Sequence, residues 1–164
     1  MSFSVPRPVR PDDNLGDFFS GNNALDQWIK TRALRNDRRA ARTYVVCDGE
    51  KITGYYSLAV GSVMRELTPG NIRRNMPEQI PVMLLVRLAL DREYQSKGLG
   101  RALIRDANLR TLRAAEIAGI RAILVHAIDD NAANFYRHCG FLSSPINSLV
   151  LLFPLKSFSL LRMT

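Results

Sequence analysis

The sequence predicts an α/β protein with a mixed central β-sheet flanked by helices, folded as a single domain over residues 1–164. Two nearly continuous apolar stretches, 82–90 and 120–128, are typical of strands that are covered on both faces. Between them, residues 101–118 have the apolar periodicity of a long helix. A chain of 164 residues, 46% of them hydrophobic, can bury the core of one such domain.

The first half of the chain predicts a helix and then a β-hairpin. Residues 22–39 have helical spacing, with a cap at Asn22 or Asn23 and four apolar side chains on one side. Strands over 43–47 and 52–60 flank an Asp-Gly turn, which is a strong hairpin signal. Turn residues at 68–70 and 77–81 predict a loop before the next strand. The four apolar side chains are Leu25, Trp28, Ile29 and Ala33.

The second half of the chain continues the alternation. The helix over 101–118 is expected to end at Gly119. The run Asp129-Asp130-Asn131 supplies N-caps for a short helix over 132–139, which Gly140 closes, and residues 148–161 predict further strands. The side chains expected to face the core from the long helix are Leu103, Ile104, Ala107, Thr111, Ala114, Ala115 and Ala118.

Composition excludes several other classes of protein. No apolar stretch of about 18 residues could span a membrane, and the N-terminal prolines and aspartates are unlike a signal peptide, so we expect a cytoplasmic protein. Two cysteines, Cys47 and Cys139, cannot form a disulfide framework, and no pair has zinc-site spacing. Two histidines without clustered partners predict no metal site.

The net charge is strongly positive. The 23 lysines and arginines against 15 aspartates and glutamates give +8, and nearly all the cations are arginines, whose planar guanidinium suits phosphate. Cations are concentrated over residues 30–42. This pattern indicates a polyanionic partner, and the alternative is a solvated helix surface.

A glycine-rich loop connects the strand over 82–90 to the long helix. In Gln95-Ser96-Lys97-Gly98-Leu99-Gly100 the glycines let backbone N–H groups approach a pyrophosphate, and the helix N-terminus that follows is positive. Lys97 and Arg101 add formal charge. The loop lacks the spacing of a P-loop and of a dinucleotide fold. The alternative is a strand-to-helix turn that contains two glycines and binds nothing.

A second segment, residues 131–141, follows the next strand. Ligands of open α/β sheets lie at the C-terminal ends of strands, so we expect this segment and the glycine-rich loop to face one crevice. Tyr136 would place there a phenol, a weak acid that can protonate a departing anion. The alternative is a core aromatic residue of the short helix.

These two segments resemble the GCN5-related N-acetyltransferase (GNAT) superfamily. Q-S-K-G-L-G matches its acetyl-CoA signature Q/R-x-x-G-x-G/A, and N-A-A-N-F-Y-R-H-C-G-F matches its tyrosine motif with one alanine displaced. More of the chain resembles the TacT-like, tRNA-acetylating toxins of bacterial toxin–antitoxin pairs. Ser20 stands where members often have cysteine, and Val86 where they often have glycine. The further matching segments are F-F-S-G-N-N-A-L-D-Q-W-I, T-G-Y-Y-S-L-A-V-G-S-V, R-R-N-M-P-E-Q-I-P-V, R-L-A-L-D and V-H-A-I.

The resemblance implies a role for each segment. Residues 95–101 would hold the pyrophosphate of acetyl-CoA, the backbone of 88–90 would pair with the pantetheine arm and polarise the thioester carbonyl, and Asn131 and Phe135 would flank that arm. Tyr136 would protonate the departing CoA thiolate. The residues so assigned to acetyl-CoA are Leu88, Ala89, Leu90, Gln95, Ser96, Lys97, Gly98, Leu99, Gly100, Arg101, Asn131 and Phe135.

The resemblance also implies a reaction and partners. Members transfer acetyl to the free α-amine of aminoacyl-tRNA, which blocks translation; they are usually homodimers silenced by a ribbon-helix-helix (DUF1778-type) antitoxin. An α-amine has a pKa of about 7.7–8, so this acceptor needs no strong base. The sequence offers only Asp91 and Glu93 as carboxylates beside the central strand. His126 is either a base or a strand histidine satisfied by its neighbours, and we expect His138 and Cys139 to be structural.

Basic residues around this site are expected to hold the tRNA acceptor stem through salt-sensitive phosphate contacts. Each of them is alternatively an ordinary surface cation or a contact for an acidic antitoxin tail. The residues are Lys30, Arg35, Arg38, Arg73, Arg74, Arg87 and Arg92. Two other functions stay open: an acetyltransferase for protein or small-molecule amines, and an inactive module that binds nucleic acid or antitoxin.

Overall fold

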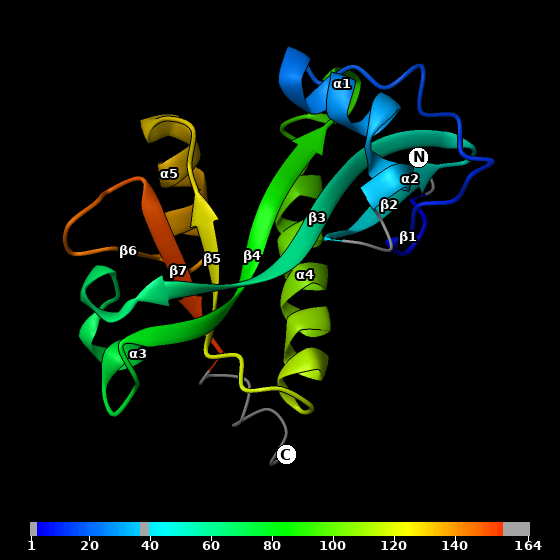
Figure 1. Ribbon diagram of the computed structural model, residues 1–164. Helices are drawn as coiled ribbons and strands as arrows, with labels where there is room; N and C mark the ends of the chain where they lie inside the picture. Colours follow the sequence, from blue (N-terminus) through cyan, green and yellow to red (C-terminus); the bar gives the residue numbers. More distant parts are fainter. Residues whose placement is uncertain (1–2, 37–39, 156–164) are drawn as a thin grey trace. The chain divides into compact units, whose positions relative to one another are not determined.

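The structure is a computed structural model that describes residues 3–36 and 40–155. Within these residues one sheet has the strand order β1-β2-β3-β4-β5-β7-β6 and contains both parallel and antiparallel pairs (Figure 1). The predicted α/β class and mixed sheet are confirmed. The chain divides into two compact units, residues 1–59 with 86–107 and residues 60–85 with 108–164.

The first unit contains the N-terminal helices and the β-hairpin. The predicted hairpin is confirmed: Asp48 pairs with Lys51 across a turn in which Gly49 has a φ of 61°. Its elements are β1 (Arg7–Pro8), α1 (Asn23–Thr31), α2 (Ala33–Asn36), β2 (Arg42–Asp48), most of β3 (Lys51–Met64), the end of β4 (Gln79–Leu90), the 3₁₀ helix η2 (Arg92–Tyr94) and the start of α4 (Leu99–Ala115).

The single helix expected over 22–39 is wrong, because the chain forms two short helices there. The cap at Asn22 is confirmed, since its side chain accepts the N–H of Leu25 at 3.1 Å. In the last turn of α1 the Thr31 hydroxyl donates to the Gln27 carbonyl, a bond that competes with the helical ladder. The helix ends there, and the chain turns at Arg32 before α2 begins.

The core of the first unit lies between α1 and the hairpin. Of the four predicted apolar side chains, Trp28, Ile29 and Ala33 are buried and Leu25 is partly buried. The Trp28 ring stacks on Tyr55, with centroids 5.9 Å apart and planes 15° from parallel. The start of α4 is tied to β3 by a hydrogen bond from the Tyr56 hydroxyl to the Asp106 carboxylate.

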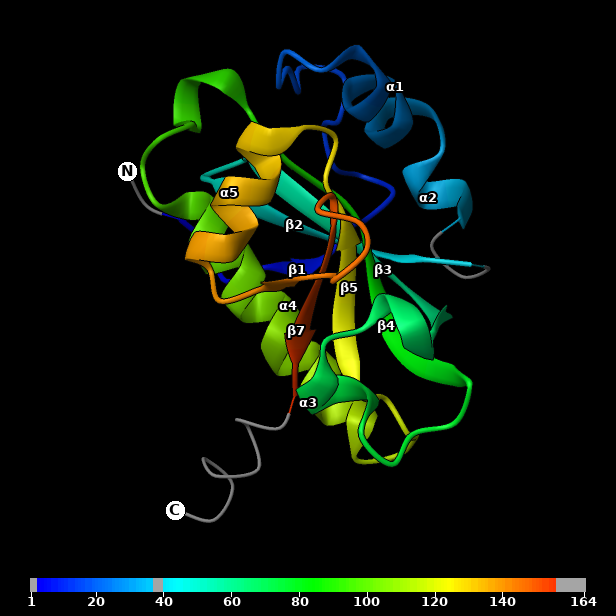
Figure 2. The same cartoon turned by 90° about the vertical axis from the view of Figure 1, so that its left-hand side faces the viewer.

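The second unit has its own core, to which β4, β5 and β7 contribute side chains. β4 runs parallel to β5, β5 pairs antiparallel with β7, and α5 packs against β7 (Figure 2). Its remaining elements are the 3₁₀ helix η1 (Arg65–Leu67), α3 (Gly70–Arg73), β5 (Ala122–His126), α5 (Asp130–His138), β6 (Leu142–Ser143) and β7 (Val150–Pro154). The buried core residues are Val63, Ile72, Ile80, Val82, Ala122, Leu124, Val150 and Leu152.

The loop expected over 68–81 is only partly a loop, because it contains α3 and because β4 begins at Gln79. Pro81 therefore lies inside a strand, two residues after its start at Gln79. It has no N–H to donate to the ladder, and its carbonyl accepts the N–H of Arg121 at 3.0 Å. The expectation that this strand is covered on both faces is also wrong, since Val86 is 43% exposed.

Three further boundaries differ from the predictions. α4 ends at Ala115 and not at 118, because Ile117 and Ala118 both donate to the Ala114 carbonyl in a closing turn, which leaves Ala118 exposed. The strand expected over 120–128 is shorter, at 122–126. Of the strands expected over 148–161, β7 is observed, and residues 156–161 lie outside the described part of the chain.

Candidate active site

The glycine-rich loop lies in the first unit, between η2 and α4. Ser96 has a φ of 63° and Gly98 a φ of 80°, so two residues of this short loop adopt the left-handed conformation. A Cβ at Gly98 would meet no atom within 4 Å, so backbone conformation and not space requires glycine there. Left-handed backbone at a non-glycine residue such as Ser96 is a strain that is concentrated at ligand sites.

The N-terminus of α4 is open to an anion. The bond from Ala102 N–H to the Gly98 carbonyl, at 3.3 Å, starts the ladder, so the N–H groups that precede it have no acceptor within the helix. The first turn of α4 carries no acidic residue, and the side chains of Lys97 and Arg101 are exposed. The helix dipole, free N–H groups and two cations together make a site suited to pyrophosphate.

The Gln95 side chain holds the loop against the rest of the first unit. Its amide nitrogen donates to the Ser20 carbonyl at 2.8 Å and to the Leu90 carbonyl at 3.0 Å. Beside it the Asp91 carboxylate, 3% exposed, accepts the N–H groups of Phe19 and Glu93. This link between residues far apart in sequence was not predicted, and no local pattern signals it.

The backbone of residues 88–90 is the predicted site for the pantetheine arm. Among the described residues, the parallel register of β4 with β5 joins 82–84 to 122–124 and so ends before Leu88. Ala89 is buried, and Leu88 and Leu90 are half-buried. A strand end of this kind offers the backbone donors and acceptors that an extended amide-containing chain pairs with.

Tyr136 lies on α5 in the second unit, together with Asn131 and Phe135. Its ring packs against Phe135 and Phe141, with centroids 5.3 and 5.4 Å away. The side chain is 8% exposed, and burial raises the pKa of its phenol to about 12. Because this pKa is far above neutral, the phenol keeps its proton at neutral pH. Within the described residues the hydroxyl donates to no protein group, so that proton is available to a ligand.

The two predicted caps, Asp129 at the N-terminus and Gly140 at the C-terminus, define the ends of α5. The Asp129 side chain accepts the N–H of Ala132 at 2.8 Å, and Gly140, with a φ of 99°, closes the C-terminus, where the N–H of Phe141 bonds to the Tyr136 carbonyl. A side chain at Gly140 would also come within 3.0 Å of Phe153. Both expectations are confirmed, and they fix the orientation of Tyr136.

The histidines differ from each other. His126 ends β5 with an exposed side chain and makes no hydrogen bond within the described residues, so the alternative of a histidine satisfied by packing and hydrogen bonds is wrong. His138 shares a 2.7 Å hydrogen bond between Nδ1 and the Asn134 carbonyl. In the described ranges no group of three or more side chains could hold a metal ion.

The predicted tRNA contacts fall into two classes. Lys30, Arg35, Arg73, Arg74 and Arg92 are exposed, as expected of residues that bind a phosphate backbone. Arg87 is half-buried. Arg38 lies outside the described residues. Arg73 and Arg74 belong to the second unit and the others described here to the first.

None of the helices in the described part of the chain combines the length and apolar character needed to cross a bilayer. The profile of the acetyltransferase (GNAT) domain family matches residues 39–142. A tRNA-acetylating toxin of Mycobacterium tuberculosis is 44% identical over 94% of this chain and 93% of its own length.

Solved structures are similar across almost the whole chain. AtaT complexed with acetyl-methionyl-tRNAfMet has a TM-score of 0.90 and 29% identity, covering 98% of this chain and 99% of that one. A variant of the AtaT toxin bound to the C-terminus of the antitoxin AtaR and acetyl-CoA has a TM-score of 0.80 and 28% identity, covering 99% of each chain.

Proposed function

This chain belongs to the acetyltransferase (GNAT) family, and on that premise we propose that it transfers acetyl from acetyl-CoA to the α-amine of aminoacyl-tRNA and so acts as the toxin of a toxin–antitoxin pair. The observation that carries the proposal is the open N-terminus of α4 behind the left-handed residues Ser96 and Gly98. The tRNA-acetylating relative, similar over nearly its whole length, supports the choice of acceptor.

In the proposed reaction residues 95–101 hold the pyrophosphate and the backbone of 88–90 orients the thioester carbonyl. The neutral α-amine attacks that carbonyl, so a C–N bond forms and the C–S bond breaks. The thiolate that leaves takes the proton of the Tyr136 phenol, which burial keeps protonated at neutral pH. The attacking nitrogen releases its extra proton to solvent as the amide forms, and the Tyr136 phenolate regains a proton from solvent. Positioning of two reactants and one acid supplies the catalysis, and no strong base is required because an α-amine has a pKa of about 7.7–8.

The exposed cations are proposed to hold the acceptor stem: Lys30 and Arg35 on the α1–α2 segment, Arg73 and Arg74 at α3, and Arg92 beside the loop. We further propose a single domain over 1–164, because β3, β4 and α4 each contribute residues to both units. A homodimer in the cytoplasm, where charged tRNA occurs, and a ribbon-helix-helix antitoxin complete the proposal.

The decisive experiment incubates the protein with labelled acetyl-CoA and total charged tRNA and identifies the labelled aminoacyl group. Label on one or a few aminoacyl groups is expected, and deacylated tRNA serves as the control without an α-amine. Label that appears instead on protein or on small amines in a cell extract would favour the alternative acetyltransferase. Absence of any transfer would favour the inactive binding module.

A further inference from the structure

The C-terminal end of β5, in the second unit, carries a titratable side chain that the mechanism above does not use. His126 is the last residue of this strand, its side chain is exposed, and within the described residues neither ring nitrogen has a hydrogen-bond partner. On the side of β4, the parallel pairing ends where Leu84 meets Leu124, so His126 lies two residues beyond the last pair. An imidazole at such a strand end is accessible to a ligand.

The register of the sheet places His126 on the face that α3 covers. Side chains two residues apart in a strand share a face, so His126 lies on the face of Leu124. The partner of His126 in β7 is Val150, and the partner of Leu124 is Leu152. Leu124, Val150 and Leu152 belong to the core cluster that also contains Ile72 of α3. His126 therefore continues this face beyond the edge of its buried core.

Tyr136 lies on the opposite face of the same two strands. Phe153 follows Leu152 in β7, so its side chain points away from the face of His126. The Phe153 ring packs against Phe141, with centroids 5.4 Å apart, and Phe141 packs against Tyr136 at the same distance. α5 and its phenol are therefore on one side of β5 and β7, and the imidazole is on the other.

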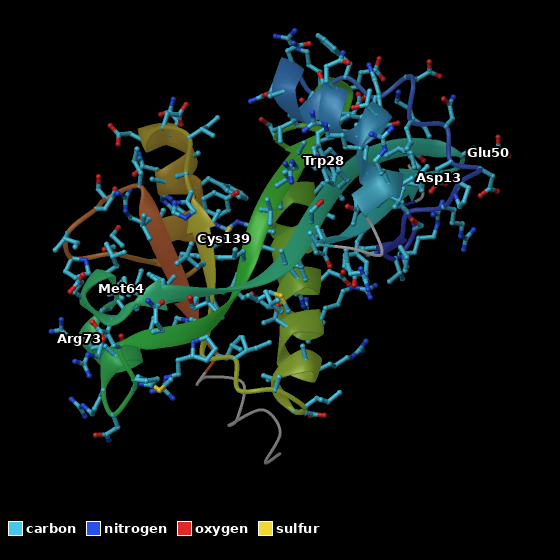
Figure 3. All side chains as sticks on the ribbon, viewed as in Figure 1. Asp13, Trp28, Glu50, Met64, Arg73 and Cys139 are labelled. Atoms are coloured by element: carbon cyan, nitrogen blue, oxygen red, sulfur yellow. The ribbon has the colours of Figure 1, made fainter. Side chains whose placement is uncertain are left out.

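The figures show the two sides. In Figure 2, α5 and α3 lie on opposite sides of β5 and β7. Figure 3 labels a residue on each side, Arg73 in α3 and Cys139 directly after α5. Arg73 is exposed and is one of the cations proposed to hold the acceptor stem. In this unit, the face of His126 is thus the face on which the proposed substrate would lie.

Acetyl transfer moves protons at two different atoms. When the neutral amine attacks the thioester, its nitrogen carries an extra proton in the tetrahedral adduct and can still depart as a neutral amine. Loss of that proton commits the adduct to cleavage of the C–S bond. Nitrogen and sulfur occupy different corners of the tetrahedral carbon, so the group that takes a proton from one and the group that gives a proton to the other must lie on different sides of it.

We propose that His126 accepts the proton that the attacking nitrogen releases, through the unprotonated nitrogen of its neutral ring. The C–N bond forms, the N–H proton passes to the imidazole, the C–S bond breaks, and the thiolate takes the proton of Tyr136. His126 then gives its proton to solvent, to which the ring is exposed, and the phenolate regains one. The inference rests on the proposed function, and it adds a catalytic base on the face opposite the acid.

The first test removes the imidazole from the full chain. His126→Ala should lower kcat with charged tRNA by about 10²-fold or more, while the KM values for charged tRNA and for acetyl-CoA each change less than about twofold. The Tm should stay at the wild-type value, because the side chain is exposed and unbonded within the described residues. A wild-type kcat would overturn the proposal. A higher KM for charged tRNA with an unchanged kcat would overturn it as well, because His126 would then bind the substrate and accept no proton.

Chemical rescue separates a proton acceptor from a residue that only shapes the strand end. Imidazole added to His126→Ala should raise kcat in proportion to its concentration, because the exposed strand end is open to a small base. His138→Ala is the matched control, since the sequence has two histidines and Nδ1 of this one shares a 2.7 Å hydrogen bond with the Asn134 carbonyl. Its kcat should stay near the wild-type value and should not respond to imidazole. A folded His126→Ala protein that imidazole does not reactivate would contradict proton transfer to His126.

The same assays keep this inference distinct from the proposed function. If the wild type acetylates charged tRNA and His126→Ala does so at the same rate, the proposed function stands and the inference fails. If the wild type acetylates a protein or small-molecule amine and no charged tRNA, the proposed function fails, and the kcat and rescue measurements with that amine still decide the role of His126. If the wild type acetylates no amine, both are wrong.

Discussion

Two helices of this protein follow strands of the sheet, yet their N-termini are built in opposite ways. At α5 the Asp129 carboxylate accepts the N–H of Ala132, and Asp130 adds a second negative charge in the first turn. At α4 the first turn contains no acidic residue, and the approach to it passes through left-handed Ser96 and Gly98.

The difference determines which helix can bind an anion. A helix N-terminus has unpaired N–H groups and carries about half a positive charge, and a carboxylate from the chain itself satisfies both. α5 is therefore closed to an external phosphate and serves to hold Tyr136, whereas α4 leaves the same groups to a ligand. The proposed function would thus divide binding and proton donation between two helices that both follow strands of the sheet.

The largest effect is expected at the acid on α5. Tyr136→Phe keeps the ring that packs on Phe135 and Phe141 but removes the proton donor, so kcat should fall by about 10²- to 10⁴-fold with an unchanged KM for acetyl-CoA. Growth arrest on expression should disappear. A Tyr136→Phe protein that remains fully toxic would contradict the role given to the phenol.

The next effect comes from making α4 resemble α5. Gly98→Asp places a carboxylate before α4 and forces a side chain into a φ of 80°, so the KM for acetyl-CoA should rise roughly 10- to 100-fold. Gly98→Asn is the matched control, because it places a side chain of the same size at the same φ without adding charge, and its KM should rise less than that of Gly98→Asp. Equal KM values for the two variants would remove the basis for assigning the pyrophosphate to α4.

The reverse change removes the carboxylate that caps the N-terminus of α5. Asp129→Ala removes the cap that accepts the Ala132 N–H and should cost about 1 kcal/mol of stability, which lowers Tm by about 2–4 °C in a chain of this size. The KM for acetyl-CoA should not change. Thermal denaturation and steady-state kinetics on the same preparation measure both quantities, and a changed KM would contradict the division between the helices.

The smallest expected effect is on the alkaline side of the pH profile. Because burial raises the pKa of Tyr136 to about 12, the phenol keeps its proton through pH 10, and no loss of kcat should occur there. With increasing pH, kcat should rise only up to about pH 8, because the acceptor amine, with a pKa of about 7.7–8, loses its proton in that range. A fall in kcat with a midpoint near 10 would show that Tyr136 titrates like an exposed phenol.

Local chemistry explains what the sequence could predict. Gly98 before α4, Asp129 before α5 and Gly140 after it are each dictated by backbone conformation or by a neighbouring N–H group, and such signals extend over only a few residues. The order of strands and helices and both halves of the candidate site follow from patterns of this kind.

Tertiary packing explains the rest. The contact of Arg87 with Trp28 joins β4 to α1, and sequence analysis treats Arg87 as one basic residue among seven. The Pro81 carbonyl likewise accepts the N–H of Arg121, a residue 40 positions away that no periodicity pairs with it.

The hydrogen bonds of Gln95 join the N-terminal segment to the loop that is proposed to bind acetyl-CoA. Gln95 donates to the carbonyl of Ser20, 75 positions upstream, while the N–H of Phe19 bonds to Asp91 and the N–H of Arg92 to the Phe19 carbonyl. The amide protons of these hydrogen bonds report on the N-terminal segment and on residues 91–95 at the same time. Acetyl-CoA should therefore slow deuterium uptake at Phe19, and a chain that begins after Ser20, and so lacks these bonds, should bind the cosubstrate less tightly.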